Sequence, residues 1–239
     1  MDVRYVVAHC ENDRRHWWFR GRLAILLAVL RRALPRRRLR ILELGCGSGN
    51  VLASLREFGD VVGMETHPAL AAAARAAGLD VRAGALPEDE VVPRGWADVV
   101  LLLDVIEHVD DDTAALRAAR RALAPAGHLV VTVPAYPWLW SSHDVLLGHR
   151  RRYTARTLRR ALVGTGFRVE RLTYFNTLLF PAVVAARFAK RLAGDTDHDL
   201  VLPPAPINRA LAGLFAFERH LVSRVSFPVG SSLLALARP

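Results

Sequence analysis

Two apolar patterns alternate along the chain from residue 39 onward. Short runs rich in leucine and β-branched residues occupy 39–44, 61–64, 98–103 and 128–133, and a weaker run occupies 80–83. Alanine-rich stretches with helical spacing lie between them at 50–57, 68–77 and 113–123, and glycine or proline follows each one. Continuous apolar strands that alternate with helices are typical of a parallel sheet covered on both faces.

The alternation changes after the fifth predicted strand. A polar and aromatic loop spans 134–153, and the pattern then predicts a helix over 155–164 and a strand over 167–175. Another apolar run, 233–237, predicts a final strand close to the end of the chain. About fifty residues separate the last two predicted strands, which is far more than a simple connection needs.

These fifty residues are predicted to form a helical insertion. They contain an apolar segment at 178–189, a proline-rich linker at 203–206 and a helical pattern at 207–225. In that last pattern one face is expected to carry Ile207, Leu211, Leu214, Leu221, Val222 and Val225.

Length and composition favour one domain with appendages. The 239 residues suffice for one full-sized core, and 52% of them are hydrophobic. The two cysteines form no disulfide framework, and no secretory signal is recognised, so we expect a cytoplasmic protein. The longest uncharged stretch, 172–186, is shorter than the ~20 residues that a membrane-spanning helix needs.

The net charge of +10 is unevenly distributed. Residues 1–40 hold 11 arginines against 3 acids, residues 41–144 hold 7 against 15, and residues 145–192 hold 11 basic residues against 1 acid. Basic flanks of this kind predict an anionic partner, and the inner membrane face is one candidate. A composition bias explains why Lys190 is the sole lysine, but it does not explain why the basic residues avoid the middle of the chain.

The loop Gly45-Cys46-Gly47-Ser48-Gly49 follows the first predicted strand and leads into a helix. A ligand that lies across the carboxyl ends of parallel strands approaches the backbone closely, and glycine permits that approach. The spacing is G-x-G-x-G with Asn50 next, which departs from the dinucleotide fingerprint. Glu43, two residues before the loop, suits a cationic ligand better than a pyrophosphate.

Four ordered motifs resemble those of the class I S-adenosylmethionine-dependent methyltransferases. Residues 43–49 are similar to their glycine motif, and Glu65 matches the acidic residue whose carboxylate holds the ribose hydroxyls. Residues 97–109 resemble the fourth-strand motif of the small-molecule branch (methyltransferase type 11/12-like), which includes quinone-biosynthesis O-methyltransferases. Residues 121–127 resemble the segment before strand five.

This resemblance implies an α/β, Rossmann-like fold. Its seven-stranded sheet is mostly parallel with an antiparallel last strand, carries helices on both faces and has the helical insertion between its last two strands. The expected divisions are an N-terminal helical lid at 1–38, a cofactor-binding core at 39–175, an insertion at 176–229 that caps the acceptor or faces a membrane, and a final core strand at 230–239.

The implied cofactor is S-adenosylmethionine, with S-adenosylhomocysteine as product. The residues predicted to bind it are Glu43, Gly45, Cys46, Gly47, Gly49, Glu65, Thr66, Gly84, Ala85, Leu86, Asp104 and Val105. Many family members hold the adenine amino group with an acid after strand three, but here that segment reads Ala83-Gly84-Ala85-Leu86-Pro87. We therefore expect backbone and apolar contacts to hold the adenine.

The acceptor side is predicted from polar residues that follow strands four and five. A hydroxyl acceptor benefits from a base that removes its proton. The candidates for this catalytic role are His108, His143 and Asp144. Candidate substrate-binding residues are Trp17, Arg20, Tyr136, Trp140, His149, Arg150, Arg152 and Tyr153. No metal site is predicted. Structural roles remain open for His108, for the arginine triplet at 150–152 and for the tryptophan pair at 17–18.

The predicted function is methylation of a small-molecule or lipid- or glycan-linked acceptor, at a hydroxyl, with arginines holding an anionic part. Peripheral contact with an anionic membrane follows from the apolar segment and its basic neighbours. RNA methylation is an alternative, but no recognisable nucleic-acid-binding module is present, so nucleic acid is not the favoured partner. A non-catalytic cofactor-binding protein is the other alternative. The sequence leaves the acceptor and the oligomeric state open.

Overall fold

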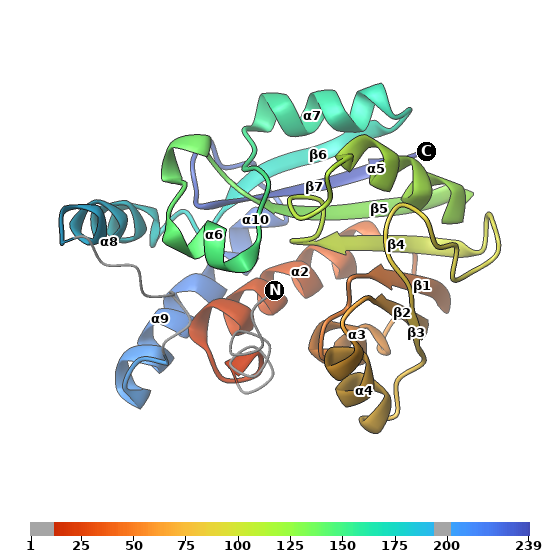
Figure 1. Ribbon diagram of the computed structural model, residues 1–239, viewed down its shortest axis with the longest axis horizontal. Coiled ribbons are helices and arrows are strands. Elements are labelled where there is room, and N and C mark those ends of the chain that lie inside the picture. Colours follow the sequence, from red (N-terminus) through yellow and green to blue (C-terminus); the bar gives the residue numbers. More distant parts are fainter. Residues whose placement is uncertain (1–11, 194–201) are drawn as a thin grey trace.

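The computed structural model describes residues 12–193 and 202–239. Within these residues, seven strands form one sheet in the order β3-β2-β1-β4-β5-β7-β6 (Figure 1). The strands are β1 (Leu39–Leu44), β2 (Gly59–Glu65), β3 (Val81–Ala83), β4 (Ala97–Leu103), β5 (Leu123–Pro134), β6 (Arg168–Phe175) and β7 (Ser232–Arg238). Neighbours from β3 through β5 are parallel, and β7 is antiparallel to both β5 and β6. The predicted sheet is confirmed.

Helices cover both faces of this sheet, as the alternation of side chains along β4 shows. Val100 and Leu102 pack with α5 (Asp112–Ala122) and α7 (Ala155–Gly164). The neighbouring residues of β4 point the other way and pack with α2 (Trp17–Ala33) and α3 (Asn50–Leu55). In Figure 1, α5 and α7 accordingly lie above the sheet and α2 lies below it. The helix α4 (Pro68–Ala76) packs beside α3.

The N-terminal segment is more than the lid that was predicted. Leu26 and Leu30 of α2 are buried against β1 and β4, so the second half of this helix belongs to the core of the fold. Its first half carries Trp17 and Trp18 toward the cavity at the carboxyl ends of the strands.

The segment predicted as a loop after strand five contains a short helix. A 3-10 turn at Pro137–Leu139 precedes α6 (Ser142–Leu147). The side chain of Asp144 accepts a hydrogen bond from the backbone N–H of Ser141 at 2.9 Å, which completes a capping box. Gly148 ends the helix in the left-handed region, with φ at 73°.

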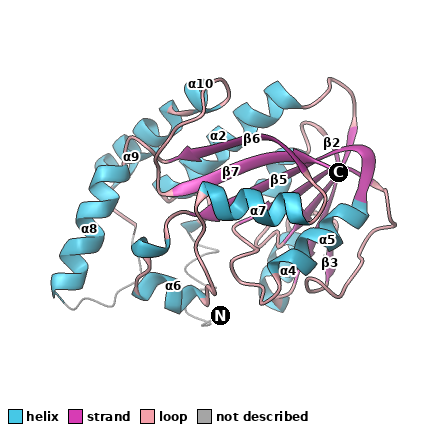
Figure 2. Ribbon diagram, turned by 90° about the horizontal axis from the view of Figure 1, so that it is seen from above, coloured by secondary structure: helices cyan, strands magenta, loops and turns pink. Residues whose placement is uncertain are grey.

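Three helices are described between β6 and β7: α8 (Phe180–Ala193), α9 (Ala205–Phe217) and α10 (Arg219–Val222). In both views α8 and α9 lie at the end of the molecule opposite to β3 (Figures 1 and 2). Within the described residues, no helix has the length and apolar character required to cross a membrane.

The buried face of α9 differs from the predicted one. Ala212 and Phe215 are buried, and an added Cβ at Gly21 of α2 would lie 2.2 Å from Cδ1 of Phe215, so the two helices meet in close contact. Of the six residues predicted to share one face, Val222 is buried and Leu211 packs against the same cluster, whereas Ile207, Leu214, Leu221 and Val225 are exposed by 40 to 54%. Because α9 is apolar on most sides, periodicity alone did not identify its buried face.

Candidate active site

The carboxyl ends of β1, β2, β4 and β5 open into a cavity of about 1300 Å³. The cavity extends from the glycine loop, past Asp104, to α6 and the segment that follows it. Clefts outside the carboxyl ends of parallel strands are the usual ligand sites of α/β sheets. Ligand pockets typically measure roughly 300–1,000 Å³, so this cavity has room for a cofactor and an acceptor together.

The glycine loop needs its glycines for two physical reasons. Gly45, Gly47 and Gly49 all have positive φ, at 75°, 57° and 82°. An added Cβ at Gly45 would lie 2.7 Å from Cγ2 of Val105, and one at Gly49 would lie 2.4 Å from Cδ1 of Leu79. The left-handed backbone and the close packing together leave no room for a larger residue.

Glu65 ends β2 with its carboxylate against the backbone of the loop. Its Oε2 accepts from the N–H of Gly47, and its Oε1 accepts from the N–H of His67, both at 2.8 Å. A carboxylate has about four acceptor positions, so each oxygen retains capacity for a ribose hydroxyl. Glu65 is therefore held in place by the backbone before any ligand arrives.

Glu43 supplies a second carboxylate at this end of the cavity. Burial raises the pKa of Glu43 to about 8; the guanidinium of Arg22 opposes this shift, and the nearby carboxylate of Glu65 reinforces it. Its Oε2 is buried and has no hydrogen-bond partner among the described residues. A buried acid of this kind is stabilised in its charged form by a cationic ligand.

Residues before and within α2 cover the glycine loop. The Ser48 hydroxyl donates to the carboxylate of Asp13, and the side-chain amide of Asn50 donates to the backbone carbonyl of Asp13 at 2.9 Å. Arg22 forms an ion pair with Asp104 and lies over the ring of Trp18, 4.8 Å from its centroid. The N-terminal segment is thus tied to both sides of the cofactor end.

Two non-glycine residues of the cavity wall have a strained backbone. Asp104 follows β4, Asn176 follows β6, and both have φ at 57°. Such conformations cost roughly 1–3 kcal/mol each and are concentrated at functional sites. Here Asp104 and Asn176 each turn the chain directly after a strand, at a point where the chain lines the cavity.

Glu107, His108 and His149 form the opposite wall. The rings of His108 and His149 are 4.7 Å apart in an edge-to-face arrangement. Burial, reinforced by the neighbouring His149, lowers the pKa of His108 to about 4, so the His108 ring is neutral at neutral pH. Burial also raises the pKa of Glu107 well above its ordinary value, and Asp104 adds to that effect.

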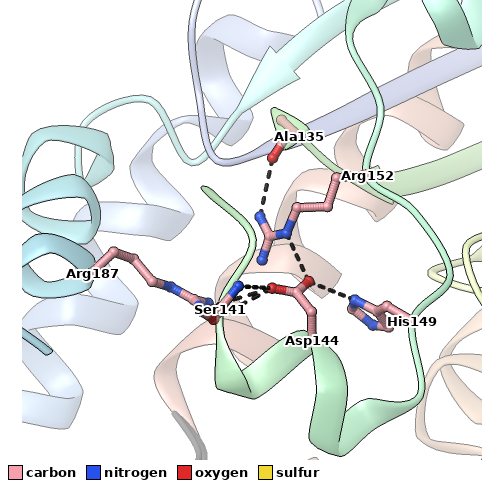
Figure 3. Close-up of polar contacts among 6 residues, drawn as sticks. All are labelled: Ala135, Ser141, Asp144, His149, Arg152 and Arg187. Atoms are coloured by element: carbon pink, nitrogen blue, oxygen red, sulfur yellow. Dashed lines mark hydrogen bonds and ion pairs between the residues drawn. The ribbon is translucent and has the colours of Figure 1, made fainter. Parts of the chain in front are cut away.

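Asp144 is fully buried behind this wall and organises it (Figure 3). Its Oδ1 contacts Nδ1 of His149 at 2.8 Å and accepts from Nε of Arg152 at 2.7 Å. Arg187 of α8 approaches Oδ2 at 3.9 Å. Although burial opposes ionisation, the hydrogen bonds from His149 and Arg152 hold the pKa of Asp144 well below its usual range.

The charge state of Asp144 determines the tautomer of His149. An ionised carboxylate only accepts hydrogen bonds, so Nδ1 of His149 carries the proton. In the neutral ring, Nε2 is then left with its lone pair. Asp144, predicted as a catalytic residue, thus acts on the ring of His149.

Most predicted site residues line the cavity. On the cofactor side they are Glu43, Gly45, Cys46, Gly47, Glu65, Thr66, Gly84, Ala85, Leu86, Asp104 and Val105. On the acceptor side they are Trp17, His108, Trp140, His143, His149, Arg150 and Arg152.

Five predicted site residues do not line the cavity. Gly49 packs beneath the loop, Asp144 lies behind His149, and Arg20 is exposed elsewhere on α2. Tyr153 is buried, with its hydroxyl donating to Asp112 at 2.7 Å. The ring of Tyr136 stacks on that of Tyr174, with centroids 5.1 Å apart.

Sequence reasoning missed several lining residues, namely Asp13, Arg22, Glu107, Asn176 and Arg187. Glu107 was detectable, because it directly precedes His108 at the end of a strand whose end was already assigned to the site. Asn176 and Arg187 carried no such signal, since they belong to the β6 end and the insertion, which reach the cavity through tertiary packing.

The chain matches the family model of a methyltransferase domain over residues 15–172 and belongs to that family. It is 33% identical over 100 residues to a ubiquinone biosynthesis O-methyltransferase of Xanthomonas oryzae pv. oryzae (strain PXO99A), covering 39% of this chain and 42% of that protein. It is 30% identical over 162 residues to a probable S-adenosylmethionine-dependent methyltransferase of Mycolicibacterium smegmatis, covering 65% and 61%. The chain therefore matches less than two thirds of either relative's length.

Solved structures show the same fold. A methyltransferase from Archaeoglobus fulgidus aligns over 100% of both chains with a TM-score of 0.60 and 18% identity. One from Mesorhizobium loti aligns over 90% of this chain and 98% of that chain, with a TM-score of 0.59 and 21% identity. Fold and glycine cradle together define a class I, Rossmann-like methyltransferase. This family and fold imply S-adenosylmethionine as the cofactor.

The residues present fit this cofactor. The left-handed glycines shape the loop at the end of β1, and the unpartnered oxygen of Glu43 suits a positively charged group. Glu65, Gly84, Ala85 and Leu86 all line the cavity, and we propose that Glu65 holds the ribose and the other three hold the adenine.

Proposed function

We propose that this enzyme methylates a hydroxyl oxygen of a small acceptor. The observation that carries the proposal is the continuous cavity, which joins the glycine loop to a wall of two imidazoles and a buried carboxylate. S-adenosylmethionine, when bound, supplies a methyl group on a cationic sulfur and is left as neutral S-adenosylhomocysteine. The relatives named as ubiquinone biosynthesis O-methyltransferases support an oxygen acceptor.

The wall residues meet the requirement of such an acceptor. A hydroxyl oxygen that forms a bond to a methyl carbon must lose its proton, and that loss is easier beside a group that accepts or displaces the proton. The His108 ring is neutral at neutral pH, and Nε2 of His149 is left with its lone pair. We place the acceptor hydroxyl against these two rings.

An anionic part of the acceptor fits the mouth of the cavity. Arg152 and Arg187 both lie against buried Asp144, so each is already engaged by a carboxylate within the protein. Arg150 also lines the cavity but is more than half exposed, and its ion pair with Asp110 is exposed as well. We therefore assign Arg150 to a carboxylate or phosphate of the acceptor.

A panel assay tests the proposed reaction. The full chain is incubated with S-adenosylmethionine and simple phenols, with and without a ring carboxylate, and the products are identified by mass and by NMR. We expect a methyl ether, formed faster with the carboxylated phenols. A product methylated on nitrogen or carbon, or cofactor binding without turnover on any acceptor, contradicts the proposal.

His108 provides the matching variant. We expect His108→Ala to lower turnover while leaving S-adenosylhomocysteine affinity unchanged by calorimetry. His220→Ala is the control, because His220 is an exposed histidine on α10 that does not line the cavity. An unaffected rate in His108→Ala would remove His108 from the mechanism.

We also propose that the insertion rests on an anionic lipid surface. Leu214 and Phe217 of α9 are exposed by 45% and 56%, and the exposed ionised residues of α9 and α10 are arginines because Glu218 is buried. Apolar side chains flanked by arginines suit the interface of an anionic bilayer. Val183 and Arg187 of α8 line the cavity, so the same insertion touches the acceptor end.

Vesicle flotation tests this surface. We expect the chain to float with vesicles of mixed phosphatidylglycerol and phosphatidylcholine and to remain in solution with phosphatidylcholine alone. Phe217→Glu should abolish flotation, whereas Val163→Glu should not, because Val163 is an equally exposed apolar residue on α7. Equal behaviour with both lipid mixtures, or of both variants, contradicts a role for this face.

A further inference from the structure

Three metal-ligating side chains converge on the acceptor wall. Glu107 and His108 follow β4, and His149 follows α6, more than forty residues later in the chain. One potential ligand atom from each lies within 4.8 Å of the other two. We propose that Glu107, His108 and His149 bind a divalent transition-metal ion.

The carboxylate of Glu107 is the strongest indication of a missing ligand. The residue is fully buried, lines the cavity, and has no hydrogen-bond partner for either carboxylate oxygen among the described residues. Buried polar groups nearly always find a partner, and an unsatisfied one calls for an explanation. Protonation does not solve the problem, because a neutral carboxyl group would still have a buried O–H donor without an acceptor.

The surroundings of His149 match those of a metal ligand. A ligating histidine almost always donates its other ring N–H to a carboxylate or a carbonyl, which fixes the ring and its tautomer. The contact between Nδ1 of His149 and Oδ1 of Asp144, at 2.8 Å, supplies that partner (Figure 3). Nε2 is then the nitrogen available to an ion.

The backbone holds the two ligand segments together. The N–H of Arg150 donates to the carbonyl of Glu107 at 2.7 Å, so the residue next to His149 is bonded directly to the other segment. The ligands therefore come from a fixed junction between the end of β4 and the end of α6, and modest side-chain adjustment would bring them to bonding distance.

Nearby arginines do not exclude a cation. Arg22 and Arg152 both act on Glu107 electrostatically. However, Arg22 pairs with Asp104, and Arg152 pairs with Asp144, so both guanidinium groups are engaged by carboxylates other than that of Glu107. The carboxylate of Glu107 is left as the charge available to an ion.

Two imidazoles and one carboxylate specify the kind of ion. This donor set suits zinc, iron, cobalt or manganese, whereas magnesium and calcium prefer oxygen ligands alone. Three protein ligands also leave coordination positions open. The role of the ion rests on the proposed function: an acceptor hydroxyl bound at an open position is favoured in its deprotonated form, and its proton is released to water.

Cobalt binding tests the site without any acceptor. The full chain, prepared without a histidine tag and stripped with a chelator, is titrated with Co²⁺ and followed by visible absorption. We expect one equivalent to bind with the absorption of a nitrogen- and oxygen-ligated ion. Glu107→Gln and His149→Gln should each weaken binding at least tenfold, and Asp144→Asn should weaken it roughly 10- to 100-fold through the orientation of His149.

The controls separate this proposal from the methylation reaction. His220→Gln should bind Co²⁺ like the wild type, and S-adenosylhomocysteine affinity shows that each variant is folded. Wild-type Co²⁺ affinity in Glu107→Gln and His149→Gln, or no Co²⁺ absorption by the wild type, overturns the metal site. If methyl ethers still form at full rate with a chelator present, the catalytic role of the ion fails while the proposed reaction stands.

Discussion

The two ends of the cavity are built in different ways. At the cofactor end, the backbone does most of the positioning: left-handed glycines shape the cradle, and two backbone N–H groups hold the carboxylate of Glu65. At the acceptor end, a network of side chains centred on buried Asp144 holds His149 and Arg152. The first kind of site is specified by local sequence, whereas the second depends on residues brought together by tertiary packing.

The largest expected effect is on the side-chain network. Arg152 bonds through Nε to Asp144 at 2.7 Å and through Nη1 to the carbonyl of Ala135 at 3.0 Å, and its side chain is almost completely buried. Arg152→Ala removes one partner of a buried ion pair, which typically costs about 3–5 kcal/mol of unfolding free energy. Chemical denaturation measures it.

The neighbouring arginine is the control for this prediction. Arg150 pairs with Asp110 at 3.2 Å, but both side chains are more than half exposed. Arg150→Ala should therefore change the free energy of unfolding by less than about 1 kcal/mol. Similar losses in the two variants would show that the acceptor end does not depend on the buried pair.

The next largest effect concerns the backbone-built end. Gly45→Ala puts a Cβ 2.7 Å from Val105 and forces a left-handed alanine, at a combined cost of roughly 2–4 kcal/mol. We expect S-adenosylhomocysteine affinity to fall by about 100-fold in calorimetry. Gly148→Ala is the matched control: φ is again positive, at 73°, but a Cβ there meets nothing within 4 Å. Equal losses of affinity would contradict the role of close packing.

This division explains how much of the fold was predictable from the sequence. The strand starting at Leu39 and the helix over Ala155–Gly164 fell where the pattern placed them, because their apolar runs, caps and stop signals are local. Glu65 lines the cavity, where it was expected because it lies twenty residues after Gly45, the usual interval of one βαβ step. In elements of this kind, the residues themselves indicate where the helix or strand begins and ends and which side chains are buried.

The acceptor end was less predictable for a physical reason. The pairing of Asp144 with His149 requires α6, a helix of six residues that was expected as loop. Its capping box, Ser141 through Asp144, was visible in the sequence as a helix-start signal. The approach of Arg187 to Asp144 was not visible, because it depends on where tertiary packing places α8 relative to α6.

A pH-dependent effect of intermediate size is expected from Glu43. Its pKa is about 8 in the folded chain and about 4.5 when exposed, so unfolding releases a proton between these values. The folded state therefore loses stability as pH rises, by about 1.4 kcal/mol per unit between about pH 5 and pH 7. Glu43→Gln should flatten this part of the stability curve measured by urea unfolding. Since Glu107 is present in both proteins, its contribution cancels in the comparison, and parallel curves would contradict the burial of an acid at residue 43.

The smallest predicted effect tests whether the cofactor end relies on one side chain at all. Glu65→Gln keeps the shape of the residue but replaces one acceptor oxygen with a donor, facing the N–H of Gly47 or that of His67. A hydrogen bond to a charged group is worth roughly 1.5–3 kcal/mol, so S-adenosylhomocysteine affinity should fall at least about tenfold. Asp60→Asn, at the exposed opposite end of the same strand, should leave the affinity unchanged. Unchanged affinity in Glu65→Gln would mean that the glycine backbone alone holds the cofactor and that the ribose lies elsewhere.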